Sequence, residues 1–160
     1  MPFDTLHRLK NMNQQAEFKR PGGVTLIAIV NAVGLIITLL FWGVVFFQRL
    51  VPWPSTLTTV TERANAATTY GFMLGDILWS APLLALATVG LWRLRSWGWL
   101  MAQMVHALWV YSMTLIWMRD AYSSVSPGAW LFTPFALVAL WATLYLWRYR
   151  DLFWANKKIS

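Results

Sequence analysis

The stretch Val24–Phe47, VTLIAIVNAVGLIITLLFWGVVFF, contains no charged side chain and lies between Arg20 and Arg49. A helix of about 20 apolar residues crosses a hydrocarbon core roughly 30 Å thick, so this stretch is long enough to span a membrane. It is longer than the apolar part of a cleavable signal peptide, which has about 7–15 residues. A largely polar segment containing Asp4 and Glu17 also precedes it. We therefore expect a retained transmembrane helix here.

Three more apolar stretches follow, and we expect transmembrane helices at about 24–47, 68–92, 97–118 and 129–147. None of them alternates between apolar and polar residues, as the strands of an outer-membrane barrel do. Of the 160 residues, 58% are hydrophobic and only 12% are charged, whereas a soluble domain is about 25% charged. This composition argues against both a soluble enzyme and a disordered chain. The predicted fold class is all-α, an integral membrane four-helix bundle that forms a single transmembrane domain over residues 1–160.

The positive charges indicate how the bundle lies in the membrane. Of the 13 Lys and Arg residues, ten fall on one side and three on the other. Because cytoplasmic loops are enriched in Lys and Arg, both termini should be cytoplasmic, namely the N-terminal segment 1–20 and the tail 148–160. Contact with anionic lipid heads accounts for the net charge of +7. No nucleic-acid partner is expected, since the charges are spread over three short segments.

The connections also constrain the fold. The turn at 93–96 is so short that the second and third helices must be antiparallel neighbours. The longer first connection contains Thr59 and Glu62 at the spacing of a capping box, which would start the second helix ahead of the membrane. The alternative is a coil lying on the lipid heads, and the sequence leaves both open.

Asp76 is the one acid inside the second apolar stretch, and an ionisable group at membrane depth is a candidate functional residue. Ser80 lies one helical turn away on the same face. Gly71 and Gly75 precede it at a spacing that lets another helix approach closely. The sequence leaves three roles open for Asp76. Its carboxyl group bonds to a neighbouring helix or to water, it forms an ion or proton site, or it makes a polar contact with a partner subunit.

His106 is the second ionisable candidate, with Asn31 and Gln103 as neutral polar residues at membrane depth. Counting residues from the turn near Arg95 separates Asp76 and His106 by about 10 Å along the helices, so we expect no direct contact between them. The only other histidine, His7, lies outside the expected spans, which excludes a haem held by two histidines of one chain.

The element Ala102-Gln-Met-Val-His106 resembles the Ala-x-x-x-His element by which bacterial light-harvesting helices hold bacteriochlorophyll. The resemblance implies that His106 would be the cofactor ligand if a pigment were bound. The first expectation is nevertheless that the chain holds no cofactor, with a pigment or a quinone as the alternative. The alternative is a histidine that is hydrogen-bonded inside the protein core. No metal site is expected. Because cysteine is absent, disulfides and Cys-based metal sites are excluded.

Twelve tryptophans is a large number for this length. Most lie at the expected helix ends, where indole side chains prefer the membrane interface. Trp79 and Trp109 lie deeper, at equal counts from the turn at 93–96. We expect their ring centroids to lie within about 7 Å of each other, as in a favourable aromatic pair. A surface for a quinone or pigment is the alternative use of these rings.

The segment Arg20-Pro-Gly-Gly-Val-Thr25, together with the turn segment Gly90–Trp99, resembles small uncharacterised bacterial four-helix inner-membrane proteins. The resemblance implies a multi-pass protein of the bacterial plasma membrane and carries no activity with it.

The chain has no metalloprotease, phosphate-binding or nucleophile-elbow motif, so no catalytic residue is expected. We expect a non-enzymatic accessory, structural or assembly subunit of a larger membrane complex, whose partners are other membrane proteins or a second copy. The alternatives are a small oligomeric transporter or channel that uses Asp76, and a pigment- or cofactor-binding subunit that uses His106.

Overall fold

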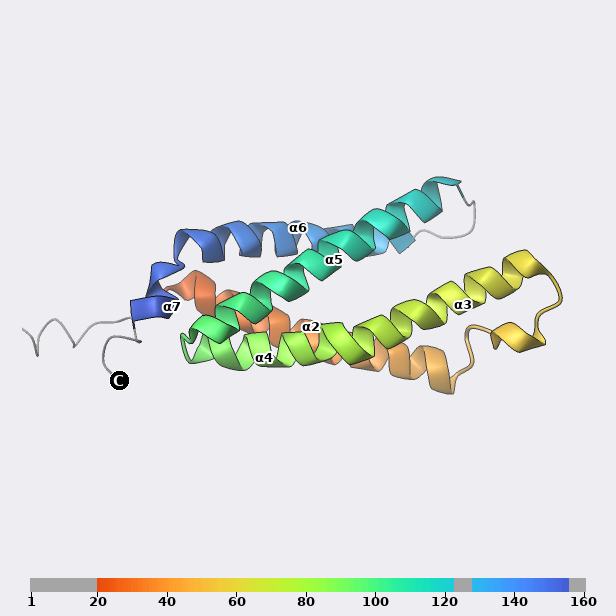
Figure 1. Ribbon diagram of the computed structural model, residues 1–160, viewed down its shortest axis with the longest axis horizontal. Coiled ribbons are helices and arrows are strands. Elements are labelled where there is room, and N and C mark those ends of the chain that lie inside the picture. Colours follow the sequence, from red (N-terminus) through yellow and green to blue (C-terminus); the bar gives the residue numbers. More distant parts are fainter. Residues whose placement is uncertain (1–19, 123–127, 156–160) are drawn as a thin grey trace, which may run out of the picture.

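The computed structural model describes residues 20–122 and 128–155, which form helices and no strand (Figure 1). The expected N-terminal segment 1–20 lies almost wholly outside the described residues. The long helices are α2 (Gly22–Phe47), α3 (Val60–Gly75), α4 (Ala81–Trp92), α5 (Ser96–Tyr122) and α6 (Gly128–Arg148). The short elements are a 3-10 turn η1 (Pro54–Thr56), a π-helical turn η2 (Asp76–Ser80) and a final helix α7 (Asp151–Ala155).

The expectation of four helices long and apolar enough to cross a membrane is confirmed. They are Gly22–Phe47, Val60–Trp92, Ser96–Tyr122 and Ala129–Arg148. The second span is the continuous succession α3, η2 and α4, which begins at Val60 rather than near residue 68. The outward faces of these helices carry large apolar side chains, for example Leu40 at 64% exposure and Leu144 at 71%. A surface of this kind is suited to lipid rather than water.

The early start of the second span follows from its N-cap. The Thr59 side chain accepts a hydrogen bond from the Glu62 backbone N–H at 3.2 Å, and its hydroxyl lies 2.8 Å from the Glu62 carboxylate. The first contact satisfies one N–H group that the first helical turn leaves without an intrahelical partner, and the second holds the Glu62 carboxylate against the Thr59 hydroxyl. Of the two readings that the sequence left open, a helix rather than a coil from Val60 onwards is therefore the one observed.

The helices pack closely at one end and diverge at the other (Figure 1). At the closed end, which contains the turn at 93–95 and the start of α2, α4 packs against both α2 and α5. Helix α6 packs against α5. At the open end, which contains the start of α3 and the end of α5, these two helices separate (Figure 1).

Two glycines fix the closed end. Gly90 of α4 and Gly98 of α5 lie so close that a Cβ added to either would overlap backbone atoms of the other. Only glycine permits this approach, because any side chain would force the two helix axes apart. The turn between the helices uses a left-handed backbone at Leu94, with φ of 50°. The antiparallel neighbours predicted from the short turn are thus held backbone to backbone.

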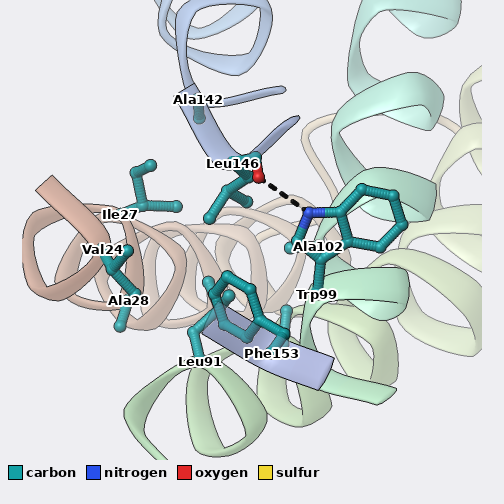
Figure 2. Packing of buried hydrophobic residues seen from close by; sticks show 10 residues of the cluster. Val24, Ile27, Ala28, Leu91, Trp99, Ala102, Ala142, Leu146 and Phe153 are labelled. Carbon is teal, nitrogen blue, oxygen red and sulfur yellow. Dashed lines mark hydrogen bonds between the residues drawn. The ribbon is translucent and has the colours of Figure 1, made fainter. Parts of the chain in front are cut away.

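The core of the closed end is a cluster of small and branched side chains from α2, α4, α5, α6 and α7 (Figure 2). Trp99 is 8% exposed in this cluster and donates from its indole N–H to the Leu146 carbonyl at 2.9 Å. Trp99 therefore ties α5 to α6, and its ring is buried inside the molecule rather than on the outward face. Phe153 of α7 is 2% exposed, so the start of the expected tail folds back into the core.

The start of α2 is tied to the end of α4 in the same region. The guanidinium group of Arg20 donates a hydrogen bond to the Trp92 carbonyl. The same group lies 4.8 Å from the centroid of the Trp92 ring, in a cation–π arrangement. A cation at the C-terminus of a helix satisfies carbonyls that have no intrahelical partner and complements the helix dipole.

A π-helical turn interrupts the second span at Asp76–Ser80. Pro82 follows it, and a proline has no N–H to donate to the carbonyl four residues earlier. The Ala81 N–H bonds to the Asp76 carbonyl five residues back, which widens the turn by one residue. Turns of this kind often occur at functional sites, and here the turn begins at the acid that the sequence singles out.

We predict that Gly98→Ala destabilises the protein by about 1–3 kcal/mol, because the added methyl group overpacks a contact between two backbones. The measurement is the midpoint of thermal unfolding in detergent micelles, followed by near-ultraviolet circular dichroism. The matched control is Gly43→Ala on α2, where an added Cβ meets nothing within 4 Å. This control should be neutral or slightly stabilising, since alanine is the better helix former. Equal midpoints for the two variants would contradict the proposed role of the Gly90–Gly98 contact.

Candidate functional site

A cavity of about 350 Å³ lies towards the open end, between α2, α3, α5 and α6. We call it the aromatic cleft, because six aromatic rings line it: Phe41, Trp42, Phe72, Trp109, Phe132 and Phe135. Its polar lining comes from Thr38, Thr69, Asp76, Ser112 and Arg119. Its volume falls within the range of small-molecule sites, about 300–1,000 Å³.

Asp76 lies in the wall of this cleft and is held by two side chains. Its Oδ2 accepts a hydrogen bond from the Trp42 indole N–H at 2.8 Å, and its Oδ1 accepts one from the Ser80 hydroxyl at 3.0 Å. The first bond crosses from α2 to the π-helical turn. The carboxyl thus bonds to a neighbouring helix, one of the roles that the sequence left open. Each oxygen retains further acceptor capacity, since a carboxylate has about four lone-pair sites.

A second cavity, of about 380 Å³, lies between the second span and α5. We call it the glycine groove, since Gly71 and Gly75 line it, together with Thr68, Phe72, Asp76, Trp79, Ser80, Leu108, Tyr111 and Ser112. An added Cβ at Gly71 or Gly75 would meet nothing within 4 Å, so none of the other helices that the structure describes occupies this face. Phe72, Asp76 and Ser112 line both cavities.

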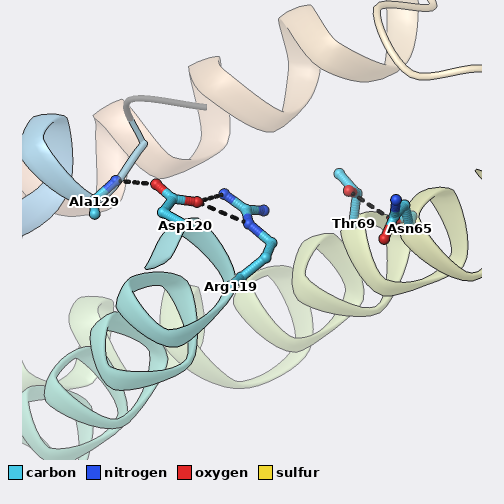
Figure 3. A network of polar contacts seen from close by, with 5 residues as sticks. All are labelled: Asn65, Thr69, Arg119, Asp120 and Ala129. Carbon is cyan, nitrogen blue, oxygen red and sulfur yellow. Dashed lines mark hydrogen bonds and ion pairs between the residues drawn. The ribbon is translucent and has the colours of Figure 1, made fainter. Parts of the chain in front are cut away.

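Arg119 lies at the open-end rim of the aromatic cleft and forms an ion pair with Asp120 (Figure 3). Its Nε and one terminal nitrogen donate to the same oxygen of Asp120, at 3.0 and 2.9 Å. The other oxygen of Asp120 accepts the Ala129 backbone N–H at 2.7 Å, which places a carboxylate at the start of α6. This arrangement complements the helix dipole and joins the end of α5 to α6.

His106 and Asn31 form a buried pair between α5 and α2. The His106 Nε2 lies 3.1 Å from the Asn31 Oδ1, and the two side chains are 1% and 0% exposed. The His106 Nδ1 and Asn31 Nδ2 have no hydrogen-bond partner among the described residues. His106 lines neither of the two cavities, and its Nε2 is engaged by Asn31. The structure thus places the histidine in a hydrogen-bonded core position, away from both cavities.

The other sequence-derived candidates are dispersed. Gln103 donates weakly to the Thr143 carbonyl of α6 at 3.5 Å. Asp76 bonds to Trp42 and Ser80, whereas His106 bonds to Asn31. These separate partners agree with the expectation that Asp76 and His106 do not contact each other directly. Within the described residues, no group of three or more His, Asp or Glu side chains is arranged to hold a metal ion.

The expected contact between Trp79 and Trp109 is wrong. The Trp79 side chain is 67% exposed on the outer surface. Trp109 packs instead against Phe135, with ring centroids 6.4 Å apart, and one edge of its ring fills the space above Gly34. Trp79 lies inside the π-helical turn, where the extra residue changes the direction in which side chains point. Counting along regular helices therefore gave the height of the ring but not its rotation.

Trp42 is the site residue that the sequence reasoning missed. Its place near the end of the first apolar stretch suggested an interfacial anchor, yet its ring is 7% exposed and its N–H is committed to Asp76. A buried indole N–H requires an acceptor, and the Asp76 carboxyl on the neighbouring span supplies it. Pro82 was the signal for the irregular turn that presents Asp76.

No known protein family, curated protein or solved structure matches this chain.

We predict a measurable coupling between Asn31 and His106. Each single substitution, Asn31→Val or His106→Leu, leaves a buried polar group unpaired and should cost about 1–3 kcal/mol. The double variant should lose at least about 0.5 kcal/mol less than the sum of the two single losses, because its remaining side chains are both apolar. Reversible unfolding in mixed micelles measures the three differences. Simple additivity would show that the two side chains do not stabilise each other.

Proposed function

We propose that this protein is a non-enzymatic, multi-pass protein of the bacterial plasma membrane. In this proposal it is a subunit of a complex and assembles with another membrane protein. The observation that carries the proposal is the glycine groove, whose small-residue face is covered by no helix among residues 20–122 and 128–155. Helix association in membranes depends on the close approach that small residues allow. The groove is therefore a suitable place for a transmembrane helix of a partner.

The lining of the groove favours a helix over a lipid tail. Thr68, Tyr111 and Ser112 place hydroxyl groups along it, and Asp76 contributes a carboxyl group. Lipid tails offer such groups no hydrogen bonds. A partner helix with small residues and a hydrogen-bond donor at the height of Asp76 satisfies both the shape and the polar groups of the groove.

The position of Asp76 argues against a second copy as the partner. In a symmetric pair that crosses at Gly71 and Gly75, the two Asp76 carboxyl groups would face each other across the contact. Like charges that share a poorly hydrated site disfavour ionisation of both. A different membrane protein avoids this repulsion.

The orientation proposed from the distribution of Lys and Arg places the closed end and both termini at the cytoplasmic side. The open end, with the start of α3 and the Arg119–Asp120 pair, then lies towards the outer side. Asp76 is 16 positions from Trp92, or about 24 Å along the helix, and thus within about 6 Å of the outer edge of a 30 Å core.

A small oligomeric transporter or channel that works through Asp76 is the second candidate. It is favoured by one observation, that Asp76 lines both cavities. Both cavities, however, lie in the open-end half, and the closed-end half is filled by the cluster around Ala87, Leu91 and Ala102. Assembly needs no rearrangement of that core, so we retain it as the proposed function.

We predict that a photo-reactive residue, Trp79→benzoylphenylalanine, cross-links to a transmembrane segment of another protein in intact membranes. Filling the groove with Gly71→Leu and Gly75→Leu should reduce the yield of this adduct at least tenfold, because the partner helix can no longer approach. The adduct is identified by mass spectrometry of the linked peptides.

The matched control is Gly43→Leu, which adds the same side chain at another open glycine on α2 and should leave the yield unchanged. A probe at Leu144 on α6, which is 71% exposed, reports random collisions with neighbours. An adduct between two copies of this chain, or equal yields from both probe positions, would contradict the proposal.

A further inference from the structure

We propose that the aromatic cleft is a binding site for a lipophilic organic cation, with Asp76 as the counter-charge. This site shares Phe72, Asp76 and Ser112 with the glycine groove in which the partner helix is proposed to bind, but Gly71 and Gly75 line only the groove. The proposal depends on the charge of Asp76, on the rings around it and on its depth in the membrane.

The charge balance of the cleft leaves Asp76 as the group to be compensated. None of the ion pairs among residues 20–122 and 128–155 includes Asp76. Its hydrogen bonds come from the neutral Trp42 and Ser80 side chains. The other charged group in the lining, Arg119, is already held by Asp120 at 2.9 Å. An ionised carboxyl at this depth is stabilised by a cation, which a ligand would supply.

The rings determine the kind of cation. Aromatic rings from α2, α3, α5 and α6 line the cleft, and the face of an aromatic ring attracts a cation through its quadrupole. A carboxylate among several rings is the combination that recognises bulky organic cations, whose charge is spread under apolar groups. A small hydrated metal ion is a poor fit, because it requires several oxygen ligands and the cleft supplies one carboxylate.

The rings also hold one another in place. Phe41 packs edge to face against Trp42 at 4.9 Å and against Phe132 at 6.0 Å, and Trp109 packs against Phe135 at 6.4 Å. Trp42 is held as well by its hydrogen bond to Asp76. The anion and the aromatic wall are therefore positioned together, which reduces the ordering cost of binding.

Its depth gives the cleft access for an amphiphilic ligand. In the proposed orientation, Asp76 lies within about 6 Å of the outer edge of the hydrocarbon core. A cation partitioned into the outer leaflet reaches that height without crossing the membrane. Its apolar groups then lie among the rings, and its charge lies near the carboxylate.

The test is equilibrium binding of radiolabelled tetraphenylphosphonium to the protein in lipid nanodiscs, with empty nanodiscs as the blank. Tetraphenylborate has the same shape and the opposite charge, so comparing the two ions on the unmodified protein isolates the effect of charge. We expect saturable binding of the phosphonium at one site per chain and none of the borate above the blank. Equal binding of both ions, or no saturable binding, would overturn the proposal.

The variants locate the site. Asp76→Asn retains an acceptor for Trp42 and removes the charge, so it should weaken phosphonium binding at least tenfold, and Asp76→Glu should restore most of the affinity. Asp151→Asn removes the same charge from α7, where the side chain is 97% exposed, and should have no effect. Phe132→Leu keeps the fold but removes one ring, and a three- to tenfold loss is expected. Unchanged affinity in both Asp76→Asn and Phe132→Leu would place the site elsewhere and refute the assignment.

This experiment separates the two proposals. Gly71 and Gly75 do not line the aromatic cleft, so the variant carrying Gly71→Leu and Gly75→Leu should retain phosphonium binding while its cross-linking is lost. Loss of binding in that variant would contradict a site in the cleft, whatever the result of the cross-linking.

Discussion

The close approach of Gly90 and Gly98 is the constraint on which the rest of the structure depends. Two helices that meet backbone to backbone beside a short turn have little freedom in their spacing at that end. Helix α2 then packs on α4, and α6 packs on α5. Trp99 and Arg20 tie these outer helices to the central pair through a hydrogen bond each. The glycine contact and these two hydrogen bonds therefore hold the closed end rigid.

The open end follows from the same geometry. Helices that touch at one end and cross at an angle must separate along their length, and the π-helical turn before Pro82 changes the course of the second span. Residues of both α3 and α5 line the two cavities. Trp42 and Asp76 bridge α2 and the second span where this separation develops. The rigid end and the open end are thus parts of one arrangement. Asp76 lies where the packing is incomplete, whereas the Asn31–His106 pair is buried.

The sequence predicted the elements of this fold well and their rotations poorly. Length and hydropathy predict four spans, and the Thr59–Glu62 spacing predicts a helix start, because both signals are local. The Asn31–His106 pair and the Trp42–Asp76 bond depend on which faces of separate helices meet. Neither periodicity nor depth fixes this in spans that are apolar on all sides. Trp79 and Trp109 illustrate the limit, since equal heights did not bring the two rings together.

Glycines illustrate the same limit. Gly71 and Gly75 have the spacing expected of a helix contact, yet no other helix in the described part of the chain touches them. Gly90 and Gly98 lie on different helices, where no spacing rule within one helix applies, and they form the tightest contact between α4 and α5. A spacing motif indicates that close approach is possible on a face, and only the packing of the whole chain decides whether that face is used internally.

The central claim, that the glycine contact closes one end while α3 and α5 diverge at the other, is tested most directly by distances between spin labels. The chain has no cysteine, so labels can be attached to introduced cysteines without background. One pair replaces Val89 and Leu100 at the closed end, and the other replaces Ala67 and Tyr122 at the open end, all at exposed positions. Pulsed electron–electron double resonance in nanodiscs should give a clearly longer distance between the labels of the open-end pair than between those of the closed-end pair. Equal distances for the two pairs would contradict the account.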